Sequence, residues 1–223
     1  MQRSFFMIGR IVSVCILCIG AVSMGTAQTL NIASGPEAAE PLQAGAAAPV
    51  FTVYDVNGEA VRFDPARLDR PLLLITFRGG WCPYCNAQLS GLRRVLPEIR
   101  RGGVDVWFLS GDRPELLFAS LQQDTQESIE GLDYRILSDA NMHAASALGI
   151  AYHVPDDTHE VYESRGRDMA DSSIALHTAL PLPAVFMIGP DGRIAFSYSN
   201  PDIRVRLPAD DVLAAAQPFM RAR

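Results

Sequence analysis

The hydrophobic and polar positions of this chain switch between strand-like and helix-like patterns. Residues 51–54 and 60–63 are rich in β-branched and aromatic side chains, and Asn57-Gly58 between them favours a tight turn, so the two segments predict a β-hairpin. Residues 72–77 form an apolar run of strand length, which indicates a buried strand.

A helical period begins shortly after this strand. Over residues 86–101 apolar side chains recur every three or four positions, which predicts a helix with one buried stripe that ends at Gly102-Gly103. The stripe consists of Leu89, Leu92, Leu96 and Ile99. Further strands are predicted at 104–109 and 134–137, and further helices at 113–123, after a capping Asp112, and at 141–148. This alternation predicts parallel strands joined by crossovers.

Residues 151–180 interrupt the alternation. They contain His153, His159 and His177 and show little periodicity, so we interpret them as an insertion or long loop near the active end of the sheet. Two interpretations stay open: a solvated surface excursion, which is common for such loops, or a lid that selects substrates.

The pattern after the insertion predicts a second hairpin and a closing helix. The apolar segments 181–188 and 193–198 flank a Gly-Pro-Asp-Gly sequence at 189–192, which favours a turn. Residues 209–220 then carry apolar side chains at helical spacing.

The first 27 residues have the composition of an export signal. Arg3 and Arg10 precede or begin a mostly apolar segment at 11–24, and small residues suitable for cleavage follow. We expect an exported, periplasmic protein without stable membrane insertion after cleavage, with an uncleaved anchor as the alternative. Cys15 and Cys18 lie inside the apolar segment and are not expected to take part in the chemistry.

Removal of residues 1–27 leaves 196 residues, enough for one domain. Residues 28–48, rich in Ala, Gly, Pro and Glu, are predicted to be a flexible lead-in, and residues 49–223 to form the domain. The chain has a net charge of −6, and the part after residue 27 has 17 Arg against 25 acidic residues, or about −8. This charge argues against nucleic acid or an anionic membrane surface as a partner. All 19 basic residues are Arg, which excludes Schiff-base chemistry at lysine.

The two remaining cysteines, Cys82 and Cys85, lie where the strand at 72–77 meets the helix that follows it. Unpaired N–H groups and the positive end of the helix dipole stabilise a thiolate at a helix N-terminus, and Pro83 suits the first helical position. Cys85 precedes Leu89 by four residues and therefore begins the buried stripe. We expect Cys82 to be the exposed nucleophile and Cys85 the shielded resolving thiol.

A C-x-x-C pair also occurs in zinc sites and in structural disulfides. A zinc site needs four ligands, and no second C-x-x-C follows Cys85, so histidines would have to complete it. The candidates are His143, His153, His159 and His177. The preceding strand, Trp81, the glycines and the intervening Pro83 favour a redox dithiol without metal or cofactor.

The order of elements resembles the thioredoxin fold, an α/β fold with a central mixed sheet flanked by helices. The opening hairpin and the sequence segments at 182–188 and 189–192 resemble the broad alkyl hydroperoxide reductase and thiol-specific antioxidant family of peroxiredoxin-like redoxins. The resemblance covers roughly residues 46–220. The resemblance implies a cis bond before Pro183, beside the dithiol, and a Leu182 backbone free to pair with an extended substrate. We expect Trp81, Tyr84 and Pro183 to shape the surface that contacts the substrate, with Pro83 and Leu182 in support.

Several positions depart from the family pattern. Peroxiredoxins carry a Thr three residues before the peroxidatic Cys and an Arg near the late strand, where this chain has Gly79 and Pro183, with Arg78 or Arg193 as possible substitutes. The Asp that assists the second thiol of thioredoxin corresponds to Thr76, which cannot act as a base. The Pro-Tyr pair between the cysteines matches glutaredoxin and suggests a potential between about −270 mV and about −120 mV.

The favoured function is an exported thiol-disulfide oxidoreductase that acts on a protein or small-molecule disulfide and is recycled by a thiol/disulfide partner. The enzyme alternative is a peroxidase that uses the same pair through a sulfenic acid. The alternative of another class is a copper-binding assembly factor that uses Cys82, Cys85 and His177, because two thiolates and an imidazole suit copper.

Overall fold

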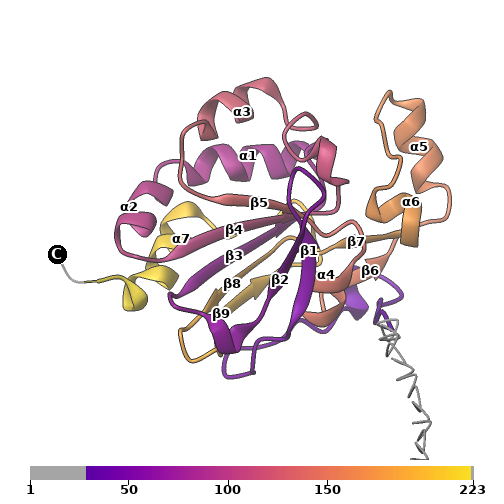
Figure 1. Ribbon diagram of the computed structural model, residues 1–223. Coiled ribbons are helices and arrows are strands. Elements are labelled where there is room, and N and C mark those ends of the chain that lie inside the picture. The colour runs from indigo at the N-terminus through magenta and orange to yellow at the C-terminus, as the bar shows by residue number, and fades with distance from the viewer. Residues whose placement is uncertain (1–28, 222–223) are drawn as a thin grey trace, which may run out of the picture.

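The computed structural model describes residues 29–221 and contains a seven-stranded mixed sheet (Figure 1). The strand order is β2-β1-β5-β4-β3-β8-β9, which confirms the predicted α/β, thioredoxin-like class. Its strands are β1 (Phe51–Tyr54), β2 (Ala60–Phe63), β3 (Leu72–Phe77), β4 (Asp105–Ser110), β5 (Arg135–Ser138), β8 (Ala184–Ile188) and β9 (Ile194–Ser199). Both predicted hairpins, β1–β2 and β8–β9, are confirmed.

The centre of the sheet positions the cysteines. Strands β3, β4 and β5 are parallel neighbours, so their C-terminal ends lie at one edge of the sheet. All six residues of β3 are buried, because β4 and β8 pair with it on either side and helices cover the sheet. The turn that follows β3 is therefore held by a fully buried strand.

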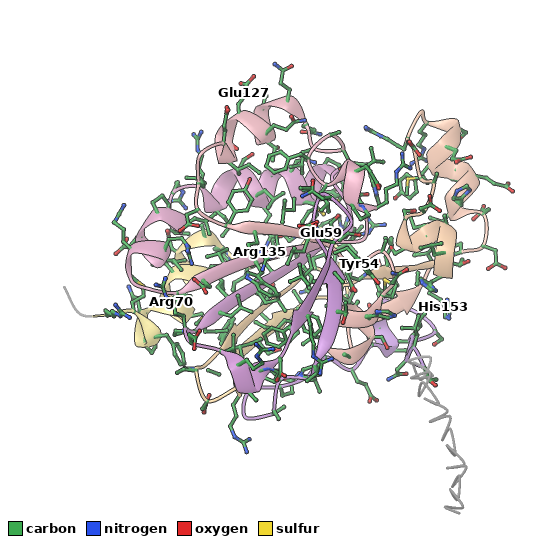
Figure 2. The ribbon with its side chains drawn as sticks, viewed as in Figure 1. Tyr54, Glu59, Arg70, Glu127, Arg135 and His153 are labelled. Carbon is green, nitrogen blue, oxygen red and sulfur yellow. The ribbon has the colours of Figure 1, made fainter. Side chains whose placement is uncertain are left out.

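Seven α-helices and four short 3₁₀ helices occur in residues 29–221. The α-helices are α1 (Pro83–Leu92), α2 (Leu96–Arg101), α3 (Gln123–Ile129), α4 (His143–Ala147), α5 (Thr158–Ser164), α6 (Ser173–His177) and α7 (Ala209–Ala216). The 3₁₀ helices are η1 (Pro36–Ala38), η2 (Pro65–Arg67), η3 (Pro114–Leu116) and η4 (Gln217–Phe219). Helix α1 contacts α3 and α7, α4 packs against β1, and α5 and α6 project at one end of the molecule (Figure 1). Polar side chains such as Glu127 and His153 point outward (Figure 2).

Two predicted helices differ in the structure. The helix predicted to begin at Pro83 and to run to residue 101 begins at Pro83 as expected, but it is broken between Leu92 and Leu96. Pro97 explains the break, because it lacks an N–H group and its ring clashes with the carbonyl of the preceding turn. The prediction of a helix at 113–123 was wrong: only η3 forms there, and α3 begins at Gln123. Asp112 does not cap a helix, because its carboxylate is used elsewhere, at the turn that follows β3.

The insertion at 151–180 has more regular structure than its sequence pattern indicates. β6 (Ala151–His153) and β7 (Ala179–Pro181) pair as a separate antiparallel ladder, and α5 and α6 lie between them in the chain. Each element is only a few residues long, which is too short for a period to be recognised.

Residues 29–48 lie along the body of the protein. The Ala33 N–H donates to the Ala151 carbonyl at 2.9 Å, and the Ala48 N–H donates to the Gly192 carbonyl at 2.9 Å. These contacts differ from the flexible lead-in predicted for 28–48, since their partners lie far away in the sequence. The predicted signal at 1–27 lies outside the described residues. None of the helices in residues 29–221 has both the length and the apolar character needed to cross a bilayer.

Candidate active site

The two cysteines lie at a strand-to-helix turn, as predicted. Cys82 is the N-cap residue of α1, and Cys85 lies in its first turn. The Cys82 N–H donates to the Gly79 carbonyl at 3.1 Å, and the Cys82 carbonyl accepts the Asn86 N–H at 3.1 Å. Both cysteines are free thiols. The turn therefore presents a reduced dithiol at the beginning of a helix.

The prediction that Cys82 is exposed was wrong. Its exposed fraction is 1%, and that of Cys85 is 0%. The Tyr162 ring from α5 lies against Trp81, with 4.4 Å between ring centroids, and the Arg78 guanidinium lies 5.1 Å from the Trp81 centroid. An Arg78 Nη2 atom also donates to the Tyr162 hydroxyl at 3.4 Å. The insertion therefore reaches the dithiol turn and packs over it.

The pKa values of the two thiols are shifted in opposite directions. The pKa of Cys82 is lowered to about 6, first by a hydrogen bond from the Cys85 thiol and further by the Cys85 N–H and the charges of Arg78 and Arg206, against the effect of burial. The pKa of Cys85 is raised well above its usual range, first by burial and then by the same hydrogen bond. At neutral pH this arrangement favours a Cys82 thiolate beside a neutral Cys85 thiol.

Arg78 and Arg193 were the two arginines considered as substitutes for the arginine of peroxiredoxins. Arg78 is 8% exposed, its charge lowers the pKa of Cys82, and a hydrogen bond from its backbone N–H lowers the pKa of Cys85, so it lies at the site. Arg193 lies at the β8–β9 turn, where its Nη1 atom donates to the Gly45 carbonyl at 2.6 Å. Arg206, which was not among the predicted site residues, also lies at the site, with its Nη2 atom 3.6 Å from the Cys85 sulfur. Nothing in the sequence near Arg206 indicated this contact, which spans 121 positions.

Asp112 supports the turn from the end of β4. Its carboxylate accepts hydrogen bonds from the Gly80 N–H at 2.7 Å, from Ser120 Oγ at 2.8 Å and from Ser110 Oγ at 3.1 Å. Burial raises the pKa of Asp112, and these hydrogen bonds oppose the rise. The carboxylate therefore connects the turn before Cys82 to the strand beside it.

The two glycines before Trp81 leave no room for side chains. A Cβ atom on Gly79 would lie 2.2 Å from Trp81 Nε1, and one on Gly80 would lie 2.7 Å from the Leu121 backbone nitrogen. This packing gives the physical reason why the position at which peroxiredoxins carry Thr is Gly79 in this chain.

Asn86, another residue that the sequence analysis missed, connects the turn to the η3–α3 segment. Its Nδ2 atom donates to the Gly80 carbonyl at 2.6 Å and to the Cys82 carbonyl at 2.9 Å, and its Oδ1 atom accepts the Gln122 N–H at 2.9 Å. An amide side chain in the first turns of the helix, beside a redox pair, is a weak signal in the sequence alone.

The expectations for Leu182 and Pro183 need correction. Residues 29–221 contain no cis peptide bond, so the bond before Pro183 is trans. The Leu182 N–H donates to the Ile150 carbonyl at 2.8 Å, and the Leu182 carbonyl accepts a hydrogen bond from Thr76 Oγ1 at 2.7 Å. The Leu182 backbone is therefore not free for a substrate. Thr76 also accepts the Ala184 N–H at 3.0 Å and joins β3 to the start of β8.

The copper alternative finds no matching geometry in the described residues. Residues 29–221 contain no group of three or more His, Cys, Asp and Glu side chains close enough to hold a metal ion. His177 lies near His143 instead of the dithiol, and its pKa is lowered by burial and by that neighbouring imidazole.

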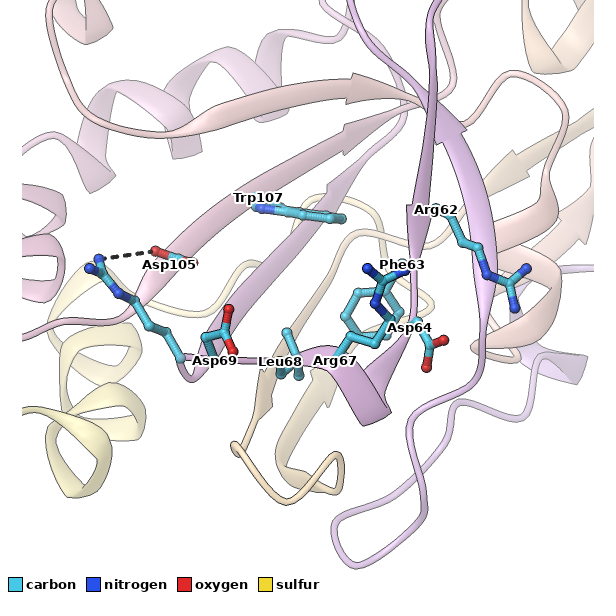
Figure 3. A pocket seen from close by; sticks show the side chains of 9 residues that line it. Arg62, Phe63, Asp64, Arg67, Leu68, Asp69, Asp105 and Trp107 are labelled. Carbon is cyan, nitrogen blue, oxygen red and sulfur yellow. Dashed lines mark ion pairs between the residues drawn. The ribbon is translucent and has the colours of Figure 1, made fainter.

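One pocket, lined by the residues drawn in Figure 3, lies away from the dithiol. It has a volume of about 430 Å³ and is lined by residues that include Phe63, Trp107 and Asp105. Asp105 is the first residue of β4, whereas the last residue, Ser110, lies at the edge that carries the cysteines. This pocket is therefore at the opposite end of the strand.

Comparisons with known proteins agree with this geometry. The family model described as "AhpC/TSA family" matches residues 44–197. The peroxiredoxin Bcp of Escherichia coli is 31% identical over 110 residues, which are 49% of this chain and 66% of that protein. The thiol-disulfide oxidoreductase ResA of Halalkalibacterium halodurans is 25% identical over 108 residues, 48% of this chain and 57% of that protein. The chain thus spans no more than about two thirds of the length of these relatives.

A solved structure shows the same fold. The crystal structure of a peroxiredoxin-like protein from Aquifex aeolicus covers 81% of this chain and 90% of its own, with a TM-score of 0.57 and 22% identity. The predicted resemblance is confirmed by a family match that covers most of the central sheet and the dithiol turn. The chain belongs to the AhpC/TSA family.

Proposed function

We propose that this protein is an oxidoreductase that acts on thiol and disulfide groups, with Cys82 as the nucleophile and Cys85 as the resolving thiol. One arrangement carries the proposal: two free thiols lie at the start of α1, with Arg206 Nη2 3.6 Å from the Cys85 sulfur. In keeping with it, the Cys85 thiol and the arginine charges lower the pKa of Cys82 to about 6, and burial raises that of Cys85. A thiolate attacks a disulfide, whereas a neutral thiol does not, so Cys82 reacts first and Cys85 second.

The reaction has two exchanges. The Cys82 thiolate attacks one sulfur of a substrate disulfide, the substrate S–S bond breaks, and the released thiolate takes up a proton. Cys85 then loses its proton and attacks the Cys82 sulfur, which releases the second substrate thiol and leaves a Cys82–Cys85 disulfide. A reduced thiol partner must return the pair to its dithiol form.

The contact surface of this enzyme is proposed to include Tyr84. Its side chain lies between the cysteines in sequence and is 44% exposed, while Trp81 is 7% exposed and packs under Tyr162. Pro83 begins α1 and fixes its direction. Tyr84 thus offers a surface next to the dithiol to a disulfide-bearing partner, and the buried Leu182 and Pro183 do not.

A peroxidase is the second candidate, favoured by the burial of Cys82. Hydrogen peroxide is small enough to enter a site in which the thiolate is 1% exposed, and the Arg78 charge lies beside that thiolate. In this reaction the Cys82 sulfur attacks one peroxide oxygen and the O–O bond breaks, giving water and a Cys82 sulfenic acid. Cys85 then displaces a second water and the disulfide forms.

Comparing the rates of oxidation by the two oxidants, each in a separate experiment, tests which reaction dominates. The full chain with Cys15→Ser and Cys18→Ser would be reduced and mixed with equal amounts of a peptide disulfide or hydrogen peroxide, and Trp81 fluorescence followed in a Trp107→Phe background. Faster oxidation by the disulfide supports the leading proposal, and the Cys82→Ser variant should show no such oxidation. A peroxide rate far above that of a free thiol would establish the peroxidase instead.

Export is also part of the proposal. The basic and apolar pattern of residues 1–27 supports a periplasmic location, and fractionation of cells expressing the full chain tests it. An intact first segment on protein recovered from the cytoplasm would contradict it.

A further inference from the structure

The second exchange poses a problem at Cys85. This thiol must lose its proton before it can attack, yet burial favours the neutral form and its exposed fraction is 0%. Thr76 occupies the place of the thioredoxin Asp, and its hydroxyl already bonds to the Leu182 carbonyl and the Ala184 N–H. Another group must therefore favour the Cys85 thiolate.

Arg206 lies against the Cys85 sulfur. It belongs to the segment between β9 and α7, and its Nη2 atom is 3.6 Å from Cys85 Sγ. Its Nη1 atom donates to the carbonyls of Ile203 and Val205, which fix the guanidinium from the other side. Its Nε atom is buried without a hydrogen-bond partner among the described residues.

Asp202 is the carboxylate that faces Arg206, whose charge helps to lower the Asp202 pKa, but the direct ion-pair partner of Asp202 is Arg204. Within residues 29–221 no ion pair joins Arg206 to an acid, whereas Arg204 pairs with Asp202 at 2.8 Å and Arg94 pairs with Asp210 at 3.5 Å. All three arginines line one groove of about 300 Å³ between α1 and residues 204–209. Arg206 is thus the arginine of this groove whose guanidinium contacts a cysteine sulfur.

The other groups around the dithiol come from five parts of the chain. Arg78 follows β3, and Cys82 caps α1. Tyr152 of β6 and Tyr162 of α5 face Arg78, and Asp112 lies under Gly80. While Cys82 is a thiolate, it holds the nearest negative charge. Once Cys82 enters a mixed disulfide that charge disappears, and the guanidinium beside Cys85 then favours ionisation of Cys85.

We propose that Arg206 is a catalytic residue that stabilises the Cys85 thiolate in the step that closes the Cys82–Cys85 disulfide. The proton of Cys85 passes to water, a bond forms between the two cysteine sulfurs, the bond between Cys82 and the substrate sulfur breaks, and the leaving thiolate takes up a proton. This role rests on the proposed function, and it applies equally when the leaving group is the hydroxyl of a sulfenic acid.

Stopped-flow mixing with dithiodipyridine, a neutral disulfide, separates the two exchanges. Each exchange releases one absorbing thiopyridone, so the first phase reports attack by Cys82 and the second reports attack by Cys85. The full chain with Cys15→Ser and Cys18→Ser would be compared with Arg206→Gln over a range of pH. Arg204→Gln is the matched control, because Arg204 lines the same groove and pairs with Asp202.

Arg206→Gln is expected to slow the second phase about tenfold at neutral pH, the effect of losing one charge-assisted hydrogen bond. The pH at which the second phase reaches half its maximum rate should move upward, and the first phase should change less. Arg204→Gln is expected to keep both phases within about twofold, since exposed ion pairs contribute little. A merely structural role of Arg206 would lower the stability without moving the pH profile.

Arg206→Lys tests the charge separately from the shape. It keeps a cation, so its second-phase pH profile should lie closer to the wild type than that of Arg206→Gln, and circular dichroism would show that both variants are folded. If the wild type shows two phases and folded Arg206→Gln keeps the same second-phase rate and midpoint, this inference is wrong while the proposed function stands. If Cys82→Ser keeps the first phase, the proposed function itself fails.

Discussion

Cys82 is the residue whose ionisation decides when the protein reacts. Its pKa is lowered to about 6, chiefly by the hydrogen bond from the Cys85 thiol, so the thiolate should appear in ultraviolet absorbance with a midpoint near pH 6. Cys85→Ala removes the donor and should move that midpoint upward by about one pH unit or more, equivalent to about 1.4 kcal/mol. Cys82→Ser is the control, in which no absorbance step should occur near pH 6. An unchanged midpoint in Cys85→Ala would contradict the assignment.

The glycines of the turn give a second prediction at this scale. A Cβ atom on Gly80 would lie 2.1 Å from Ser120 Oγ and 2.7 Å from the Leu121 backbone nitrogen, so Gly80→Ala should destabilise the protein by about 2 kcal/mol, as overpacking does. Gly91, inside α1, has nothing within 4 Å of its Cβ position, and Gly91→Ala should stabilise the protein by about 0.5–1 kcal/mol. Denaturant unfolding of both variants measures the difference. If Gly80→Ala changed the free energy of unfolding no more unfavourably than Gly91→Ala, the turn would have relaxed around the added Cβ atom and the prediction would be wrong.

Helix α5 is the element that closes the site. Tyr162 lies 4.4 Å from Trp81 between ring centroids and accepts a hydrogen bond from Arg78, so Tyr162→Ala should uncover Cys82. The rate of Cys82 modification by a bulky maleimide should rise several-fold relative to iodoacetamide, because only the larger reagent is hindered by the ring. Glu160→Ala on the exposed face of α5 is the matched control. A parallel rise with both reagents would indicate loss of structure instead of opening.

Helix α4 carries a pH-dependent contribution to stability. Asp139 accepts the N–H groups of Ala144 at 2.9 Å and Ala145 at 2.8 Å, yet burial raises its pKa to about 7. For an acid whose pKa is raised on folding, stability is greatest below the unfolded pKa and falls as pH rises through the folded one. The wild type should therefore lose up to about 1.4 kcal/mol per pH unit relative to Asp139→Asn between about pH 4 and 7. Parallel unfolding curves for the two proteins across this range would refute the contribution.

Local patterns predicted the elements that carry the cysteines but not those that surround them. The strand at 72–77 and the helix start at Pro83 follow from neighbouring residues, and both are present. Tyr162 and Arg206 lie at the dithiol, but the sequence around each of them does not predict this position. Their positions depend on tertiary packing. The exposure of Cys82 was predicted wrongly for the same reason.

At the scale of the whole molecule, the alternation of strands and helices was enough to predict the thioredoxin-like sheet. The backbone pairing of the lead-in and of the insertion was not predicted, since their partners lie far away in the sequence. Ala33 bridges to Tyr152, and Ala47 bridges to Arg193. A pattern confined to a short window contains no information about partners at such distances, which explains why both segments resembled loops.

The redox potential is a property of the whole protein that the site predicts. A lowered pKa at Cys82, supported by Cys85 and two arginines, stabilises the reduced form relative to the disulfide and makes the protein more oxidising. We expect a potential between about −270 mV and about −120 mV, measured by equilibrating the full chain, with Cys15 and Cys18 replaced by Ser, against known ratios of reduced and oxidised glutathione. Because the same charges stabilise the thiolate, Arg206→Gln should shift the potential toward more negative values, whereas Arg204→Gln should not. A wild-type value at or below about −270 mV would mean that the buried disulfide is stabilised as much as the thiolate.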